Sequence, residues 1–385
     1  MSATNFFNVQ NLEKADPDKI IEFIRIIGKH NNSADYIIEL SKNYYISGGS
    51  DNYLILYDSD YLEKTKIKDF NDWVYKVGEK KSSGKDDFKL FCVVNKTFDI
   101  VSLDKNLKPT FSQYQLQNKT IMNFIEMKEN NFILSGIGGT SYYLDLFSQK
   151  KMSEYKITDK YYIGGIRITD KTAAITSNCI LPDGEDNLLI YHTKKKQSFS
   201  IKNYSFIASV NGLALMPVEE IKSNYKILLC ACKQYKKGQK NGILLVNPQL
   251  GDNKEIEEPF YLMNDFEVYC FCPILIVENK KGLKKEEQIT NTDYFFVGGM
   301  DLLKRKGKIK LFKMLYGAKA WETKIKYIQD IEFESTENFE DFDGPISCIT
   351  QSKETGHILI TCYNGFVYLF TPPNIDYYLE EDREE

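Results

Sequence analysis

Arginine, histidine and tryptophan are scarce in this chain of 385 residues, which contains four arginines, three histidines and two tryptophans. Because bidentate recognition of phosphate groups depends on arginine, this scarcity argues against a nucleic-acid partner. The 50 basic and 54 acidic residues give a net charge of −4, so no global positive field would attract nucleic acid or an anionic membrane. The composition therefore makes nucleic acid and anionic membranes poor candidates for a partner.

Long apolar runs are also missing, and no stretch of about 18 apolar residues is available to span a bilayer. Residues 1–16 lack the basic start and the apolar centre of a signal peptide. The eight cysteines lie mostly in short apolar runs typical of strands, and without a signal peptide we expect them to be reduced and free. These observations predict a cytoplasmic location, with a cytoskeletal or ciliary assembly as a special case.

Catalytic and cofactor-binding motifs are missing as well. His30, His192 and His357 are not spaced as metal ligands on one element, and no Gly-x-Ser-x-Gly motif is present. Residues 78–86 resemble a phosphate-binding loop only superficially. Five residues separate the two glycines, and Asp86 stands where a Ser or Thr would contact Mg²⁺. The sequence predicts neither an enzyme nor a bound cofactor.

Two Cys-x-Cys pairs, Cys230 with Cys232 and Cys270 with Cys272, offer one possible metal site. On a strand this spacing places both thiols of a pair on one face. Four thiolates could bind zinc if the two strands were adjacent, but zinc sites favour two or more intervening residues in a loop. Packing of these thiols in a strand core is the favoured interpretation, and no metal is predicted.

What the chain does contain is a repeated pattern of short strands rich in Ile, Val, Tyr and Phe. Aromatic residues make up 14% of the sequence, with 26 Tyr and 24 Phe, and they favour strands. The third strand of each repeat starts near residues 53, 97, 141, 187, 242, 307 and 365. A period of roughly 40–45 residues with about four strands per repeat is typical of a β-propeller blade.

The sequence thus predicts an all-β fold, a single seven-bladed β-propeller over residues 18–373. Residues 1–17 form an N-terminal tail and residues 374–385 an acidic C-terminal tail. The last blade lacks a fourth strand because two prolines follow Phe370. We expect residues 21–27 to supply it and so close the ring. A helix over the same residues is the alternative, since Asp16-Pro17-Asp18 has the features of a helix start.

Residues 28–58 carry a more detailed pattern. Gly28-Lys29-His30 precedes two strands, Asp51 lies in the tight turn that follows, and Tyr57-Asp58 ends the next strand. This unit resembles a repeat of the WD40 family, in which Trp-Asp occupies the last two positions. The resemblance implies that His30 and Asp51 hydrogen-bond to each other and, with Tyr57 and Asp58, brace the blade. Other repeats depart from the motif, so the chain resembles a divergent member of that family.

The spacing between repeats lengthens only in the C-terminal half, where charged insertions appear. Neutral drift is one explanation, because lengthening a hairpin loop costs little entropy. Residues 332–343 nevertheless place three phenylalanines among carboxylates, an unusual content for a solvated loop. We expect a partner-binding surface on the last three blades, with apolar anchors inside an acidic rim. The three anchors are Phe333, Phe339 and Phe342.

The function predicted from these features is a non-enzymatic protein-interaction scaffold, a WD40-like subunit of a larger assembly. Its expected partners are other proteins, and no homo-oligomer is expected. The alternative is a propeller enzyme of the hydrolase or lyase type with a site in the central channel. The absence of clustered histidines or acidic motifs disfavours that alternative.

Overall fold

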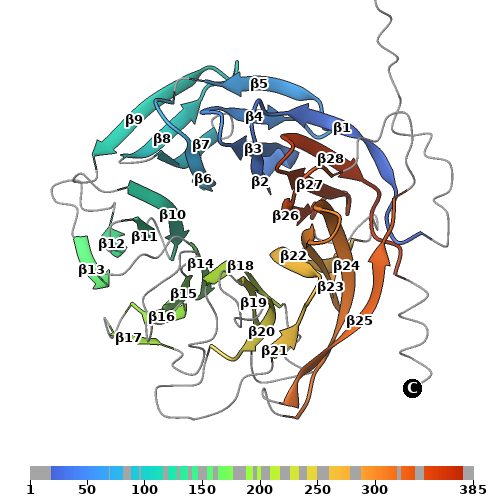
Figure 1. Cartoon of the computed structure of the whole chain (residues 1–385). Coiled ribbons are helices and arrows are strands. Elements are labelled where there is room, and N and C mark those ends of the chain that lie inside the picture. Colours follow the sequence, from blue (N-terminus) through green and yellow to red (C-terminus); the bar gives the residue numbers. More distant parts are fainter. Residues whose placement is uncertain are drawn as a thin grey trace, which may run out of the picture.

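Antiparallel β-sheets surround a central axis, and in each sheet built from consecutive strands the first strand lies nearest the centre of the ring (Figure 1). Figure 1 is a computed structural model of the whole chain. None of the helices in the described part has the length and apolar character that a membrane crossing requires. The structure describes residues 19–68, 70–80, 88–94, 97–115, 120–127, 131–137, 141–145, 154–158, 164–176, 188–193, 197–200, 209–216, 226–233, 241–248, 260–277, 288–318, 322–333 and 342–375.

Six sheets are each built from four strands that follow one another in the sequence. The first contains β2 (Ala34–Glu39), β3 (Tyr45–Gly49), β4 (Leu54–Tyr57) and β5 (Glu63–Ile67), with the 3-10 helix η2 (Ser41–Asn43) between β2 and β3. The second contains β6 (Val74–Lys80), β7 (Phe88–Val94), β8 (Thr97–Leu103) and β9 (Pro109–Gln115). The third contains β10 (Thr120–Glu126), β11 (Asn131–Ile137), β12 (Ser141–Asp145) and β13 (Glu154–Thr158).

The remaining three contiguous sheets come from the second half of the chain. The fourth contains β14 (Gly164–Thr169), β15 (Thr172–Thr176), β16 (Leu188–His192) and β17 (Gln197–Ser200). The fifth contains β18 (Ser209–Leu215), β19 (Leu228–Lys233), β20 (Gly242–Val246) and β21 (Phe260–Leu262). The sixth contains β22 (Phe266–Val277), β23 (Ile289–Asp301), β24 (Lys306–Leu315) and β25 (Lys324–Ile331).

One further sheet joins the two ends of the chain, and we call it the composite sheet. It contains β26 (Ile346–Gln351), β27 (Ile358–Cys362), β28 (Phe366–Phe370) and, at its outer edge, β1 (Phe23–Lys29). The expectation of seven blades therefore needs correction in one respect. Counted as units of four consecutive strands, the described chain has six blades, and the remaining sheet exists only because β1 pairs with β28.

The N-terminal segment closes the ring as a strand, and this excludes the helix alternative for these residues. β1 runs antiparallel to β28, from Phe23 opposite Phe370 to Lys29 opposite Phe366, and it lies two residues later than residues 21–27. Hydrogen bonds extend the pairing beyond the strand, because the Thr371 amide donates to the Glu22 carbonyl at 2.9 Å. The prolines after Phe370 leave this edge to be completed from the other end of the chain.

A register shift recurs near the start of the innermost strand in six of the seven sheets. Each shift is a β-bulge, in which one extra residue is left unpaired and its side chain is re-aimed. In β14 the shift falls nearer the end of the strand instead. The bulged residues of the other six innermost strands are Asp35, Tyr75, Met122, Asn211, Tyr269 and Ser347.

The core lies between neighbouring sheets rather than at one central point. One cluster combines Leu54 and Leu56 of the first sheet with Val77 and Leu90 of the second. The largest cluster joins the sixth sheet to the composite sheet and includes Phe370. Because each sheet buries both faces against its neighbours, apolar residues fill the second and third strands of nearly every sheet. The stability of the ring is therefore distributed around it.

Candidate interaction site

The structure brings His30 and Asp51 together in the first sheet. His30 Nδ1 lies 2.9 Å from Asp51 Oδ1, and His30 Nε2 lies 2.9 Å from Ser47 Oγ. Ser47 Oγ lies a further 3.0 Å from the hydroxyl of Tyr57. A chain of hydrogen bonds thus runs from the turn after β3, through the loop after β1, to the end of β4. We call Asp51, His30, Ser47 and Tyr57 the blade brace.

Local packing fixes the blade brace. The ring of Tyr53 stacks on that of His30, with centroids 5.2 Å apart. A side chain at Gly28 would collide with the Tyr57 hydroxyl, because an added Cβ would lie 2.1 Å from it. Burial raises the pKa of Asp51, but hydrogen bonds and charge from His30 outweigh this effect and hold the pKa below its ordinary value. The carboxylate therefore stays ionised in the brace.

Asp58 has a different role from the one that the resemblance implied. Its Oδ1 accepts backbone N–H groups from Asp60 and Leu62, each at 3.0 Å. Its Oδ2 lies 3.3 Å from Lys64 Nζ. Asp58 therefore organises the turn between β4 and β5 and takes no part in the hydrogen bonds of the brace.

Aspartate, histidine and serine connected in this way resemble a hydrolase triad, but their burial argues for a structural role. Ser47 is 0% exposed and His30 is 1% exposed. The Ser47 hydroxyl is also engaged by Tyr57. A substrate carbonyl would need to lie within about 3 Å of this hydroxyl, and the packed blade leaves no path to it. The arrangement is suited to bracing the blade.

The four cysteines of the Cys-x-Cys pairs do not meet. Cys230 and Cys232 belong to the core cluster between the fourth and fifth sheets, whereas Cys272 belongs to that between the sixth sheet and the composite sheet. Burial raises the pKa of Cys272 to about 12, which disfavours the thiolate that zinc requires. Within the described residues no group of three or more His, Cys, Asp or Glu side chains could hold a metal ion.

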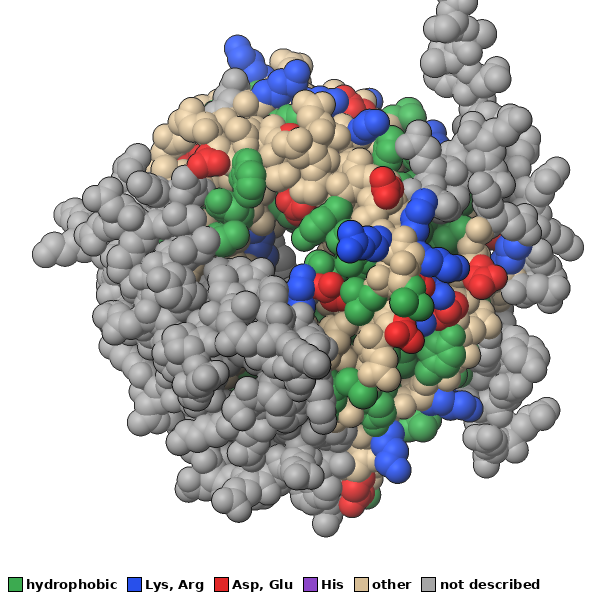
Figure 2. Space-filling model, in the orientation of Figure 1, with side chains coloured by type: hydrophobic (Ala, Val, Ile, Leu, Met, Phe, Trp, Pro, Cys, Tyr) green, Lys and Arg blue, Asp and Glu red, His purple; other side chains and the backbone are tan. Residues whose placement is uncertain are grey.

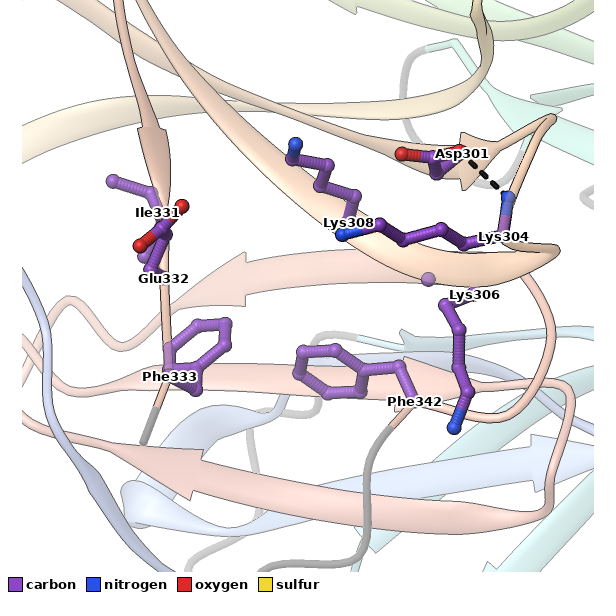
Figure 3. A pocket seen from close by; sticks show the side chains of 9 residues that line it. Asp301, Lys304, Lys306, Lys308, Ile331, Glu332, Phe333 and Phe342 are labelled. Carbon is purple, nitrogen blue, oxygen red and sulfur yellow. Dashed lines mark hydrogen bonds between the residues drawn. The ribbon is translucent and has the colours of Figure 1, made fainter. Parts of the chain in front are cut away.

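A pocket of about 270 Å³ lies where the sixth sheet meets the composite sheet, and we call it the junction pocket. Phe333 and Phe342 lie on one side of it, and Asp301, Lys304 and Lys308 lie across from them (Figure 3). Its complete lining is Asp301, Lys304, Lys306, Gly307, Lys308, Ile331, Glu332, Phe333 and Phe342.

The placement of the three predicted anchors corrects their expected role. Phe342 is only 4% exposed and packs edge-on against Tyr368, with centroids 4.8 Å apart. Phe333 packs against Phe342 at 5.5 Å and is partly buried. Phe339 lies outside the described residues. Phe342 is therefore a core residue that forms a wall of the junction pocket, and it does not project into solvent as an anchor would.

Backbone contacts hold Phe342 in this position. The Gly307 amide donates to the Phe342 carbonyl at 2.8 Å, and Lys306 forms a parallel bridge with Gly344. An added Cβ on Gly307 would lie 2.6 Å from the Phe342 Cβ and 2.7 Å from the Gly344 carbonyl oxygen. Only glycine permits so close an approach, so Gly307 allows β24 to pack against Phe342 beside the junction pocket.

The charge around the junction pocket differs from the acidic rim expected from the sequence. Three lysines line it against two carboxylates, Asp301 and Glu332. Asp301 is already engaged, because its Oδ1 accepts the backbone N–H groups of Leu303 and Lys304, each at 2.9 Å. Figure 2 shows basic side chains interspersed with hydrophobic and acidic ones over the part of the ring formed by β22–β28. The pocket therefore offers a basic border and an aromatic wall.

No protein-family model matches the chain, and no curated protein matches it. Among solved structures, 937 chains match. One belongs to a structure described as "Crystal Structure of Mitotic Checkpoint Complex", with a TM-score of 0.62 and 10% identity over 96% of this chain and 98% of that one. Identity this low shows the fold alone, so the chain is a β-propeller in fold. So many matches indicate a widespread architecture, and membership of the WD40 family stays a prediction.

Proposed function

We propose that this protein is a non-enzymatic interaction scaffold, a WD40-like propeller that binds an acidic segment of a partner protein at the junction pocket. The observation that carries the proposal is that basic and aromatic side chains line the same pocket. These are Lys304, Lys306 and Lys308 on its border and Phe333 and Phe342 on its wall. A segment with an apolar side chain flanked by carboxylates would complement both features. The structural neighbour from a multi-protein complex supports a role in an assembly.

Lys304 and Lys308 differ in whether the ammonium group is already engaged in an ion pair within the protein. Lys308 forms an ion pair with Asp330, whose Oδ1 also lies 2.6 Å from Lys310 Nζ. Lys304 is exposed in the turn between β23 and β24, and none of the described carboxylates pairs with its side chain. Beside it, Leu303 is 81% exposed. Lys304 and Leu303 are therefore the residues of this turn best placed to contact a partner directly.

The experiment is quantitative recovery of partners with tagged full-length protein and its variants. Reversing one border charge, Lys304→Glu, should lower recovery of the specific partner about fivefold or more, with a stronger effect at low salt. Lys105→Glu is the matched control, because Lys105 is also exposed in an aspartate-stabilised turn, between β8 and β9. Equal loss of the partner with both variants, or no loss with Lys304→Glu, would refute binding at the junction pocket.

A further inference from the structure

Lys76 is a half-buried lysine of β6 whose ammonium has no anionic partner in the described part of the chain. Its Nζ donates to Asn123 Oδ1 at 2.6 Å and lies 5.5 Å from the ring centroid of Phe124. Among the described residues no carboxylate forms an ion pair with it. Two other partly buried lysines of the ring do have one: Lys233 pairs with Glu267, and Lys310 with Asp330. Burying a cation without a counter-charge costs free energy, so the presence of Lys76 at this position calls for an explanation.

The neighbouring amide adds a second unsatisfied donor. Asn123, on β10, is 4% exposed, and its Nδ2 has no hydrogen-bond partner among the described residues. Lys76 retains further N–H groups beyond the one given to Asn123 Oδ1. Burial alone lowers the pKa of Lys76 to about 8, which is the response of a cation with no anion beside it. Two adjacent groups therefore present hydrogen-bond donors that lack an acceptor.

We propose that Lys76 and Asn123 form a binding site for a carboxylate supplied by an aspartate or glutamate side chain of a partner protein. A carboxylate carries one negative charge and two acceptor oxygens, which match one ammonium and one amide donor. A phosphate dianion would bring a second negative charge, and the described residues supply no second cation here. Buried polar groups that lack a protein partner commonly mark the place of a missing ligand or water.

The surroundings favour an acidic residue of a protein over a free carboxylate. Trp73 is 48% exposed, and its ring meets that of Tyr75 edge-on with centroids 6.2 Å apart. Tyr75 is the bulged residue of β6, immediately before Lys76. Large exposed aromatic side chains are enriched where proteins bind one another. The combined site would take an acidic side chain with an apolar neighbour. This site is separate from the junction pocket, which lies on other sheets. The two proposals have in common only that the partner is an acidic segment of a protein.

The first test measures binding of a fluorescein-labelled hexaglutamate peptide to the full chain by fluorescence anisotropy. Lys76→Met should weaken binding about tenfold, because it removes the positive charge that would pair with the carboxylate. Lys226→Met is the matched control, since Lys226 Nζ donates to a backbone carbonyl, that of Ile168, at 3.1 Å, and it should leave binding unchanged. Equal affinity of Lys76→Met and the unmodified protein would overturn the proposal.

The second test needs no variant and so does not depend on folding of a mutant. The protein without substitutions is labelled with an amine-reactive reagent, in the presence and in the absence of hexaglutamate. Mass spectrometry then measures the extent of labelling at each lysine. Hexaglutamate should slow labelling of Lys76 severalfold and leave Lys226 unaffected. Unchanged labelling of Lys76 would overturn the site. Acetate is tested at the same total concentration of carboxylate groups as the peptide. If acetate slows labelling of Lys76 as much as hexaglutamate does, the assignment to a protein partner is overturned. The variant Lys304→Glu should keep this protection, which separates the site from the junction pocket.

Discussion

The phenolic hydroxyl of Tyr45 lies 2.8 Å from Ser352 Oγ, although 307 residues separate them in the sequence. Tyr45 belongs to the first contiguous sheet, and Ser352 directly follows β26 of the composite sheet. Further bonds cross the same junction: Thr350 Oγ1 donates to the Ile37 carbonyl at 2.7 Å. Polar contacts thus bond the composite sheet to the first sheet, in addition to the apolar clusters that it shares with the first and the sixth sheets.

The first prediction concerns this closure. Deleting residues 1–28 removes nearly all of β1 and exposes the edge of β28, so we expect insoluble or strongly destabilised protein. Deleting only residues 1–17 should leave the thermal midpoint close to that of the full chain. Thermal unfolding followed by circular dichroism distinguishes the outcomes. If the longer deletion melts like the full chain, β1 does not hold the ring together.

The second prediction concerns the blade brace. His30→Ala and Asp51→Ala should each lower the free energy of unfolding by about 1–3 kcal/mol, because each leaves a buried partner unsatisfied. The double variant should cost less than the sum of the single variants, since both remove the same hydrogen bond. Urea unfolding of the three variants and the unmodified protein completes the cycle. Strictly additive losses would show that the two side chains do not interact in solution.

Features that depend on local patterns could be predicted from the sequence. The strand repeat follows from the spacing of short apolar runs. The closing strand follows from the two prolines after Phe370, which leave the last blade one strand short, and the proximity of His30 to Asp51 was implied by the resemblance of residues 28–58 to a WD40 repeat. The role of Ser47 in the blade brace was not predicted, although the sequence indicates one. Apart from Tyr45, Ser47 carries the only side-chain hydroxyl of the buried strand β3. A hydroxyl within an apolar strand must find a hydrogen-bond partner.

Features that depend on distant contacts could not be predicted in this way. Carboxylates around Phe342 suggested exposure, but its position is set by the approach of Gly307 from another strand. The bulge at Tyr75 arises from pairing of β6 with β7, and nothing in the residues near Tyr75 indicates it. The missing counter-charge of Lys76 likewise becomes apparent only when β6 and β10 are placed side by side.

The third prediction concerns the close packing of Gly307 against Phe342 beside the junction pocket. Gly307→Ala should lower the free energy of unfolding by about 1–3 kcal/mol, because the added methyl group collides with Phe342 and with the backbone of Gly344. Phe342→Ser should cost at least as much, since it empties a buried position. Urea unfolding measures both. A Gly307→Ala variant as stable as the unmodified protein would mean that residues 342–344 do not pack against β24 in solution.

The last prediction concerns the dependence of stability on pH. His357 is 8% exposed, its Nδ1 lies 3.3 Å from the Tyr61 hydroxyl, and its Nε2 has no hydrogen-bond partner in the described part of the chain. Burial lowers the pKa of His357 from 6.5 to about 4. Between these two values the unfolded chain binds the proton and the folded chain does not. Stability should therefore be complete above pH 6.5 and fall as the pH decreases towards 4.

The contribution of His357 lost across this window is about 3 kcal/mol, since each pKa unit corresponds to about 1.4 kcal/mol. Carboxylates also begin to titrate near its lower end, so the informative quantity is the difference in slope between variants. Urea unfolding at half-unit steps from pH 4.5 to 7.5 should show a shallower decline for His357→Gln than for the unmodified protein. Parallel curves for His357→Gln and the unmodified protein would show that His357 remains accessible to protons in the folded ring.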